Sequence, residues 1–148
     1  MVDLDERRLT LLLVGAIIVS TVGIVYFSAT PNQRTDPYTE FYIEGEGGNA
    51  SDYPQDLTVG EAGSLTVGIG NHEHRAMQYT LVMRLDDETI RTQTITVEND
   101  ETWEGERSFS PSSSGRQRLQ LLLYRGDTVP QNAEPYRTVY LWGTVDKA

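Results

Sequence analysis

The chain has 148 residues, a formal net charge of −10 and no cysteine. This length suggests one domain of ordinary size with extensions. The lack of cysteine excludes thiol chemistry and thiolate metal sites, so the apolar core must hold an exterior domain together without disulfides. The acidic balance repels nucleic acid, and no basic stripe in the sequence reverses it.

The basic residues are almost all arginine, with eleven arginines beside the single lysine, Lys147. An acidic excess with so little lysine favours a chain that stays soluble in strong salt, where screening reduces charge repulsion to a few ångströms. We interpret this composition as that of a halophile. An ordinary acidic surface domain is the alternative interpretation.

An uncharged segment, Leu9–Phe27, predicts a transmembrane helix. It is long enough to cross about 30 Å of hydrocarbon, and its only hydroxyl side chains before the aromatic end are Thr10, Ser20 and Thr21. Tyr26 and Phe27 stand where an aromatic belt would lie. A cleaved signal peptide is the main rival, but the apolar stretch is too long for one, and no small-residue cleavage site follows.

Arg7 and Arg8 directly precede this segment. By the positive-inside rule they keep the N-terminus, residues 1–8, in the cytoplasm and place the rest of the chain outside. We therefore expect a single-pass protein of the cell membrane. Residues 28–37, with two prolines, are expected to be an extended linker to an exterior domain.

From residue 38 to 146, apolar and polar residues alternate in short runs separated by turns rich in Gly, Asn, Asp and Pro. This pattern predicts an all-β, antiparallel β-sandwich of seven to eight strands; an up-and-down barrel is the alternative. The expected core residues come from the apolar positions of these runs: Leu65, Val67, Ile69, Tyr79, Leu81, Met83, Ile95, Val97, Trp103, Phe109, Leu119, Leu121 and Leu123.

Several short motifs carry a resemblance to a known family. They include the runs 38–43 (YTEFYI), 52–54 (DYP), 57–61 (LTVGE), 71–73 (NHE), 101–104 (ETWE) and 122–125 (LLYR). In order and spacing they resemble a family of archaeal membrane proteins catalogued as domain of unknown function 1616, often found in halophiles. The resemblance implies an immunoglobulin-like exterior domain and brings no activity with it. Many members carry several helices before that domain, whereas this chain has one.

The sequence offers weak candidates for chemistry. His72 and His74, two apart on a strand, could face one ion, but a metal site needs at least three ligands, and we predict no metal and no cofactor. Ser112–Ser114 lack a nucleophile motif, and the paired carboxylates Asp86–Asp87 and Asp100–Glu101 fall in predicted turns. We therefore expect no enzyme.

Two further surface features stand out. Asn49 begins the sequon Asn49-Ala50-Ser51 in a Gly-rich loop, and it is a candidate for glycosylation. The exterior domain is also rich in aromatic residues that could form a recognition patch or lie half-buried in strands. These are Tyr38, Tyr42, Tyr53, Tyr124, Tyr136, Tyr140 and Trp142.

A complete sandwich pattern without a catalytic set indicates a non-catalytic interaction or scaffold module at the cell surface. Its expected partners are the membrane, through Leu9–Phe27, and a protein or glycan, with homo-oligomers possible and nucleic acid excluded. The alternative is an accessory subunit of a membrane complex in envelope assembly, glycosylation or secretion. A metal-dependent enzyme would rest on His72 and His74 alone.

Overall fold

The computed structural model of the chain describes residues 6–29 and 36–148, and the side chains of residues 6–21 and 36–148. The chain divides into two compact units, with the boundary between Asp36 and Pro37. Of the predicted linker, residues 30–35 lie outside the described residues.

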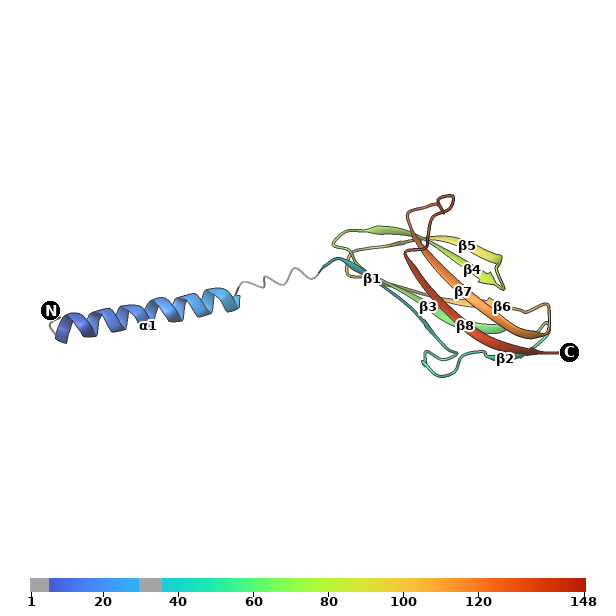
Figure 1. The fold of residues 1–148 in the computed structure, drawn as a ribbon, viewed down its shortest axis with the longest axis horizontal. Helices are drawn as coiled ribbons and strands as arrows, with labels where there is room; N and C mark the ends of the chain where they lie inside the picture. Colours follow the sequence, from blue (N-terminus) through green and yellow to red (C-terminus); the bar gives the residue numbers. More distant parts are fainter. Residues whose placement is uncertain (1–5, 30–35) are drawn as a thin grey trace. The chain divides into compact units, whose positions relative to one another are not determined.

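The first unit contains helix α1 (Glu6–Ala29), which includes the whole of the predicted segment Leu9–Phe27 (Figure 1). The hydroxyls of Thr10 and Thr21 donate hydrogen bonds of 2.8 Å to carbonyl oxygens four residues back, so the helix satisfies both by itself. Across the described residues, no helix combines the length and the apolar character needed to span a membrane. The last six positions of the predicted membrane segment, 22–27, lie outside the residues whose side chains are described.

Residues 36–148 form eight strands. In chain order they are β1 (Tyr38–Glu44), β2 (Asp56–Thr58), β3 (Gly63–His72), β4 (Met77–Leu85), β5 (Glu88–Val97), β6 (Thr102–Phe109), β7 (Gly115–Arg125) and β8 (Arg137–Asp146). Their polar and apolar residues alternate because each sheet has one buried and one wet face. The expectation of an all-β sandwich is therefore confirmed.

The strands form two sheets. The smaller, here called sheet A, has the order β1-β3-β6, and the larger, sheet B, has the order β2-β8-β7-β4-β5. All pairs are antiparallel except the short parallel pair of β2 with β8. The order β8-β7-β4-β5 corresponds to the G-F-C-C′ order of an immunoglobulin-like sandwich.

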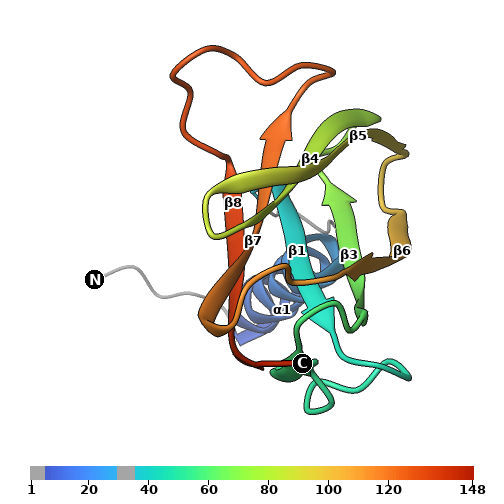
Figure 2. The same ribbon diagram turned by 90° about the vertical axis from the view of Figure 1, so that its right-hand side faces the viewer.

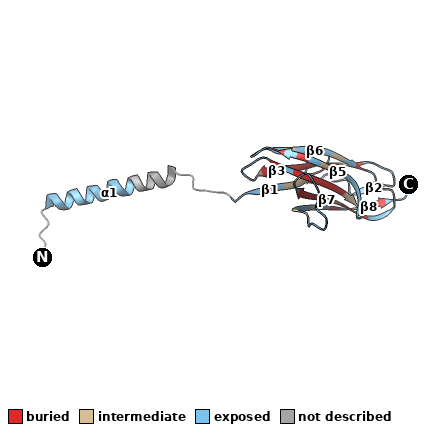
Figure 3. Cartoon of the chain, turned by 90° about the horizontal axis from the view of Figure 1, so that it is seen from above, coloured by how far each residue is buried: buried red, intermediate tan, exposed pale blue. Residues whose placement is uncertain are grey.

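The core lies between the two sheets, as the buried layer in Figure 3 shows. All thirteen residues predicted for it pack there; twelve are buried, and Trp103 is half-buried at its rim. The core also takes in Met77 and Leu141. Trp103 lies on β6, an edge strand of sheet A, where one side of a side chain stays accessible to solvent.

The turn between β4 and β5 follows the prediction for Asp86 and Asp87. Both residues have positive φ, 46° and 70°, as a two-residue hairpin turn requires. Asp86 also ties the turn to β7, since its carboxylate accepts a hydrogen bond of 2.8 Å from the backbone N–H of Arg118. Solvation and turn geometry account for these carboxylates without any chemistry.

The core predicts a clear difference between two aliphatic truncations. Leu121→Ala is expected to lower the free energy of unfolding by about 2–5 kcal/mol, because Leu121 is fully buried in the core. Ile90→Ala, on the exposed part of β5, is the matched control and is expected to cost less than about 1 kcal/mol. Urea unfolding of the full-length protein measures both, and equal costs would contradict this core.

Candidate functional site

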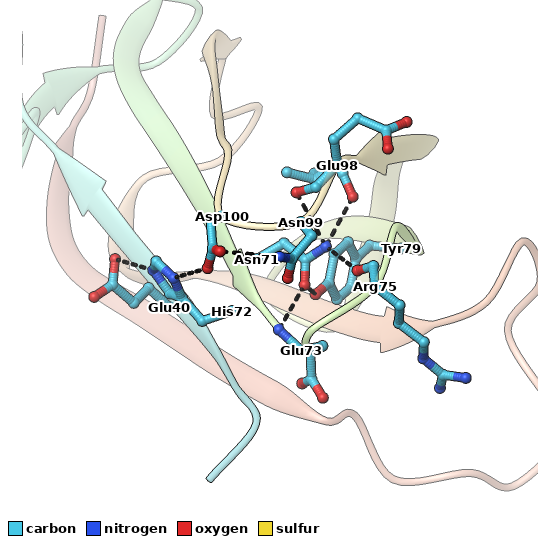
Figure 4. A network of polar contacts seen from close by, with 10 residues as sticks. Glu40, Asn71, His72, Glu73, Arg75, Tyr79, Glu98, Asn99 and Asp100 are labelled. Atoms are coloured by element: carbon cyan, nitrogen blue, oxygen red, sulfur yellow. Dashed lines mark hydrogen bonds and ion pairs between the residues drawn. The ribbon is translucent and has the colours of Figure 1, made fainter. Parts of the chain in front are cut away.

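Three loops meet at one end of the sandwich, and a buried polar network joins them. They are residues 73–76 between β3 and β4, residues 98–101 between β5 and β6, and residues 126–136 between β7 and β8. Figure 4 shows the centre of this network, where Asn71 at the end of β3 lies among side chains and carbonyls of the first two loops. Asn71 belongs to the run 71–73 that carries the family resemblance, but the sequence did not predict this buried role for it.

The side chain of Asn71 is fully buried and forms hydrogen bonds through both its nitrogen and its oxygen. Its amide nitrogen donates to the carbonyl oxygens of Arg75, Val97 and Glu98 at 2.7, 2.8 and 3.2 Å. Its side-chain oxygen accepts from the backbone N–H of Glu73 at 3.0 Å. A buried amide with its hydrogen bonds satisfied fixes the loops that it joins, so the role of Asn71 is structural.

Glu73 extends the network toward the third loop. One carboxylate oxygen accepts hydrogen bonds from the hydroxyl of Thr39 at 2.8 Å, the guanidinium of Arg125 at 2.6 Å and the hydroxyl of Tyr136 at 2.9 Å. Burial by itself would raise the pKa of Glu73, but these hydrogen bonds and the charge of Arg125 outweigh it and lower the pKa below its ordinary value. Glu73 is therefore a stabilised carboxylate and a poor general acid.

The ring of Tyr136 lies between two guanidinium groups, with the carbon of Arg125 at 3.6 Å from the ring centroid and that of Arg137 at 4.3 Å. In the interior of the domain, the hydroxyls of Tyr79 and Thr39 lie 2.8 Å apart. Burial raises the pKa of the Tyr79 phenol, which keeps it protonated. These contacts tie the loop between β7 and β8 to the end of β3.

The histidine pair does not have the geometry that strand spacing predicted. His72 ends β3, but His74 lies in the following loop with a φ of 60°, so alternation along a strand no longer places the two rings on one side. His72 instead stacks on Tyr38 and lies 3.3 Å from Asp100 and 3.7 Å from Glu40. Among the described residues, no group of three or more His, Asp or Glu side chains could hold a metal ion.

The predicted loop serines are likewise part of the scaffold. Ser113 accepts hydrogen bonds of 2.6 and 2.7 Å at its carbonyl and hydroxyl oxygens from the buried amide of Gln117. Asp100 has a φ of 60° in the turn after β5.

A cavity of about 20 Å³ lies between the sheets, large enough for one water molecule and far smaller than a substrate pocket. It is lined mainly by apolar residues that include Leu57, Leu85, Phe109, Leu119, Leu141 and Val145.

The predicted aromatic patch is scattered over several parts of the domain. Tyr136 and Tyr38 belong to the loop end, Tyr42 faces outward from sheet A, and Tyr53 donates to the carbonyl of Ile43 at 3.0 Å. Tyr124 is buried with Val82 and Leu122 in a small cluster on the outer side of sheet B. Only Tyr140 and Trp142 share an exposed surface, on β8, with exposed fractions of 61% and 42%.

Arginines of β7 join these two aromatics on the outer face of sheet B. Trp142 pairs with Arg118 across the strands, and Tyr140 pairs with Gln120. The guanidinium carbons of Arg116 and Arg118 lie 4.5 and 5.5 Å from the centroid of the Trp142 ring, at cation–π distance. We call the surface made by Arg116, Arg118, Tyr140 and Trp142 the arginine–aromatic face.

This face departs from the acidic character of the chain. Outward positions along β4 (78–84), β7 (116–124) and β8 (138–144) include Arg84, Arg116 and Arg118 but no carboxylate, and those of β5 between 92 and 96 are all threonine. Carboxylates lie only at its margins: Asp87, in the turn after β4, is 3.0 Å from the guanidinium of Arg118, and Asp56 on β2 lines a shallow hollow with Arg116 and Trp142. In a chain with a net charge of −10, a strand surface with Trp, Tyr and Arg has the composition of a binding hot spot.

Asn49 lies exposed in the loop between β1 and β2, with its amide nitrogen 3.4 Å from a carboxylate oxygen of Asp52. An exposed loop position is what the glycosylation sequon requires, and glycosylation stays a prediction. Arg7 and Arg8 lie in the first turn of α1, and the membrane orientation assigned to them stays a prediction as well.

The lowered pKa of Glu73 predicts a pH-dependent stability difference. At neutral pH, Glu73→Gln is expected to lower the free energy of unfolding by about 1–3 kcal/mol, because charged hydrogen bonds to a buried group are lost. The wild-type advantage is present above the ordinary glutamate pKa of about 4.3 and disappears as the pH falls through the lowered folded-state value.

Urea unfolding of the full-length protein at a series of pH values checks this expectation. Glu134→Gln, at an exposed position of the loop between β7 and β8, is the control and should follow the wild type at every pH. A Glu73→Gln deficit that stays constant down to strongly acidic pH would contradict the role given to the carboxylate.

Solved structures with a similar fold support the sandwich. The crystal structure of a CARDB domain from Pyrococcus furiosus, solved in complex with di-metal ions, is 14% identical, covers 76% of this chain and 90% of its own, and has a TM-score of 0.57. The beta-glucosidase of Listeria innocua is 12% identical over 76% of this chain and 16% of its own, with a TM-score of 0.55. A chain of the human complex of zinc 2-glycoprotein with prolactin inducible protein is 8% identical, covers 79% and 100%, and has a TM-score of 0.51. At these identities the likeness shows the fold alone.

No curated protein matches the chain in sequence. A family model does match it over residues 31–144, which includes β1 to β7 and β8 as far as Thr144. The chain therefore belongs to the family described as domain of unknown function DUF1616.

Proposed function

We propose that this protein is a membrane-anchored, non-catalytic interaction module at the cell surface, and that it binds a partner protein through the arginine–aromatic face. The observation that carries the proposal is the gathering of Arg116, Arg118, Tyr140 and Trp142 on the outer face of sheet B, where carboxylates lie only at the margins. Tyr, Trp and Arg dominate the energetics of protein interfaces because they offer large rigid contact areas and several donors.

The strand scaffold of this face favours a protein partner. The neighbouring strands β7 and β8 hold the four side chains in register, so no loop must be ordered when a partner binds. At the β5 side, Val129 of the long loop and the cluster of Val82, Leu122 and Tyr124 line a shallow hollow, which adds apolar contact to the charged part. A surface that joins an apolar hollow to arginines and aromatics suits an acidic protein surface with some apolar side chains.

A non-catalytic role is supported by the loop end. There, the polar side chains of Asn71, Glu73 and Tyr136 bind one another and backbone carbonyls, so they stabilise loops. Catalysis needs a nucleophile or base within reach of a substrate, and the side chains of the loop end are instead engaged in hydrogen bonds with one another. The fold shared with a CARDB domain is compatible with an interaction module.

Membrane anchoring is supported by the sequence and the helix. Apolar side chains surround α1, and among its described residues Leu11, Leu12, Ile17 and Val19 are 62–73% exposed. A helix that is apolar all round needs a protein or lipid environment to cover it. The internal hydrogen bonds of Thr10 and Thr21 suit lipid surroundings, where an unsatisfied hydroxyl is costly. The origin in a halophilic archaeon stays a prediction from the composition and the resemblance.

Crosslinking in native cells tests the proposal. The full-length protein is crosslinked at native salt, recovered from the membrane fraction and analysed by mass spectrometry, in the wild type and in the double variant Arg116→Glu/Arg118→Glu. We expect the wild type to fractionate with membranes and to recover a stoichiometric partner, and the variant to lose that partner because the reversed charges repel an acidic surface.

The matched control carries the same charge change elsewhere. Arg75 and Arg91 are exposed, in the loop after β3 and on β5, and Arg75→Glu/Arg91→Glu should keep the partner. Equal recovery of the partner by both double variants would overturn the assignment of the face. Recovery of the wild type only from the soluble fraction would overturn the anchor.

A further inference from the structure

The outer face of sheet A carries negative charge, whereas the arginine–aromatic face carries positive charge. Its outward positions hold Glu40 and Glu44 on β1, and Glu104 and Glu106 on β6, but no arginine or lysine. The two pairs of glutamates flank a central column of β3 that contains Gly68 and Gly70. We call the surface made by these four glutamates the acidic face.

The acidic face is also fixed in shape. The ring of Tyr42 lies over Gly68, where a Cβ would collide with it, and its hydroxyl donates a hydrogen bond of 2.7 Å to Glu104. This hydrogen bond and partial burial raise the pKa of Tyr42 to about 12, so the phenol stays a donor at physiological pH. The two central glycines thus leave room for the side chains of Tyr42 and Glu40, which lie across β3.

The two faces lie on opposite outer sides of one sandwich, because sheets A and B pack through their inner faces (Figures 2 and 3). Two copies that meet through like faces would bring glutamate to glutamate or arginine to arginine. Two copies that meet through unlike faces would bring Arg116 and Arg118 toward carboxylates. Like-charge contacts disfavour association and opposite charges steer it, so the charge pattern selects the unlike pairing.

We infer that the partner of the arginine–aromatic face is the acidic face of a second copy of this chain, so that the sandwiches associate head to tail. The inference rests on the proposed function, since it names the partner of the same face. Such a contact is heterologous: each added copy leaves one acidic and one arginine–aromatic face open at the ends of the assembly. The expected product is therefore a row of copies that lengthens with concentration, unless the rotation between copies closes it into a ring.

A charge-swap experiment tests this inference. The full-length protein in detergent is measured by sedimentation velocity over a range of concentrations, alone and as two reversed variants, Arg116→Glu/Arg118→Glu and Glu104→Arg/Glu106→Arg. We expect the wild type to associate, and each variant alone to lose at least about tenfold in association constant for each reversed pair. An equimolar mixture of the two variants should associate again, because it restores opposite charges at the contact.

The mixture also controls for folding, since two misfolded proteins would not rescue each other. The control variant Arg75→Glu/Arg91→Glu should associate like the wild type. Association through α1 would be the same in every variant, so it would not depend on which charges are reversed. A wild type that stays monomeric, or variants that fail to associate when mixed, would overturn the inference. If the crosslinked partner is then still lost in cells for Arg116→Glu/Arg118→Glu, the face binds a different protein and the proposed function stands.

Discussion

One buried amide, the side chain of Asn71, holds the loop end of the sandwich together. Its nitrogen donates hydrogen bonds to the carbonyl oxygens of Arg75, Val97 and Glu98, and its oxygen accepts one from the backbone N–H of Glu73. The carboxylate of Glu73 in turn binds Arg125 at the end of β7 and Tyr136 in the loop that follows. A network of this kind is costly when partly satisfied, so it either forms completely or loosens all three loops. The loops that carry recognition in many immunoglobulin-like domains are here tied to one another, which leaves the sheet faces as the surfaces available for binding.

Those faces divide the charge of the molecule. Four glutamates lie on the outer face of sheet A, and three arginines lie at outward positions of β4 and β7 in sheet B, although the chain as a whole is strongly acidic. Arginine is the suitable cation for this role, because its planar guanidinium can stack on Trp142 and still donate hydrogen bonds to a carboxylate. The rigidity of paired strands keeps both charge patterns fixed, so the cost of ordering side chains on binding is small.

The sequence predicted the strands well because alternation is a local signal: each of the thirteen expected core residues packs in the core, and Trp103 is half-buried only because β6 is an edge strand. The network of Asn71 was missed because its partners lie up to 27 positions away along the chain, and the run 71–73 does not reveal which carbonyls the amide meets. His72 and His74 do not share one side of a strand, because β3 ends at His72 and His74 lies in the following loop. The arginine–aromatic face depends on the register that sets Arg118 opposite Trp142, and a single sequence does not reveal which strands pair.

Radical footprinting of aromatic side chains in intact cells tests the central claim most directly, namely that a partner covers the outer face of sheet B. The oxidation rates of Tyr140 and Trp142 are compared between cells and the dilute purified protein, with Tyr136 at the loop end as the internal reference. The account predicts strong protection of Tyr140 and Trp142 in cells and an unchanged rate for Tyr136. Equal oxidation of Trp142 in both preparations would contradict it, because the face would then be open to solvent where the protein works.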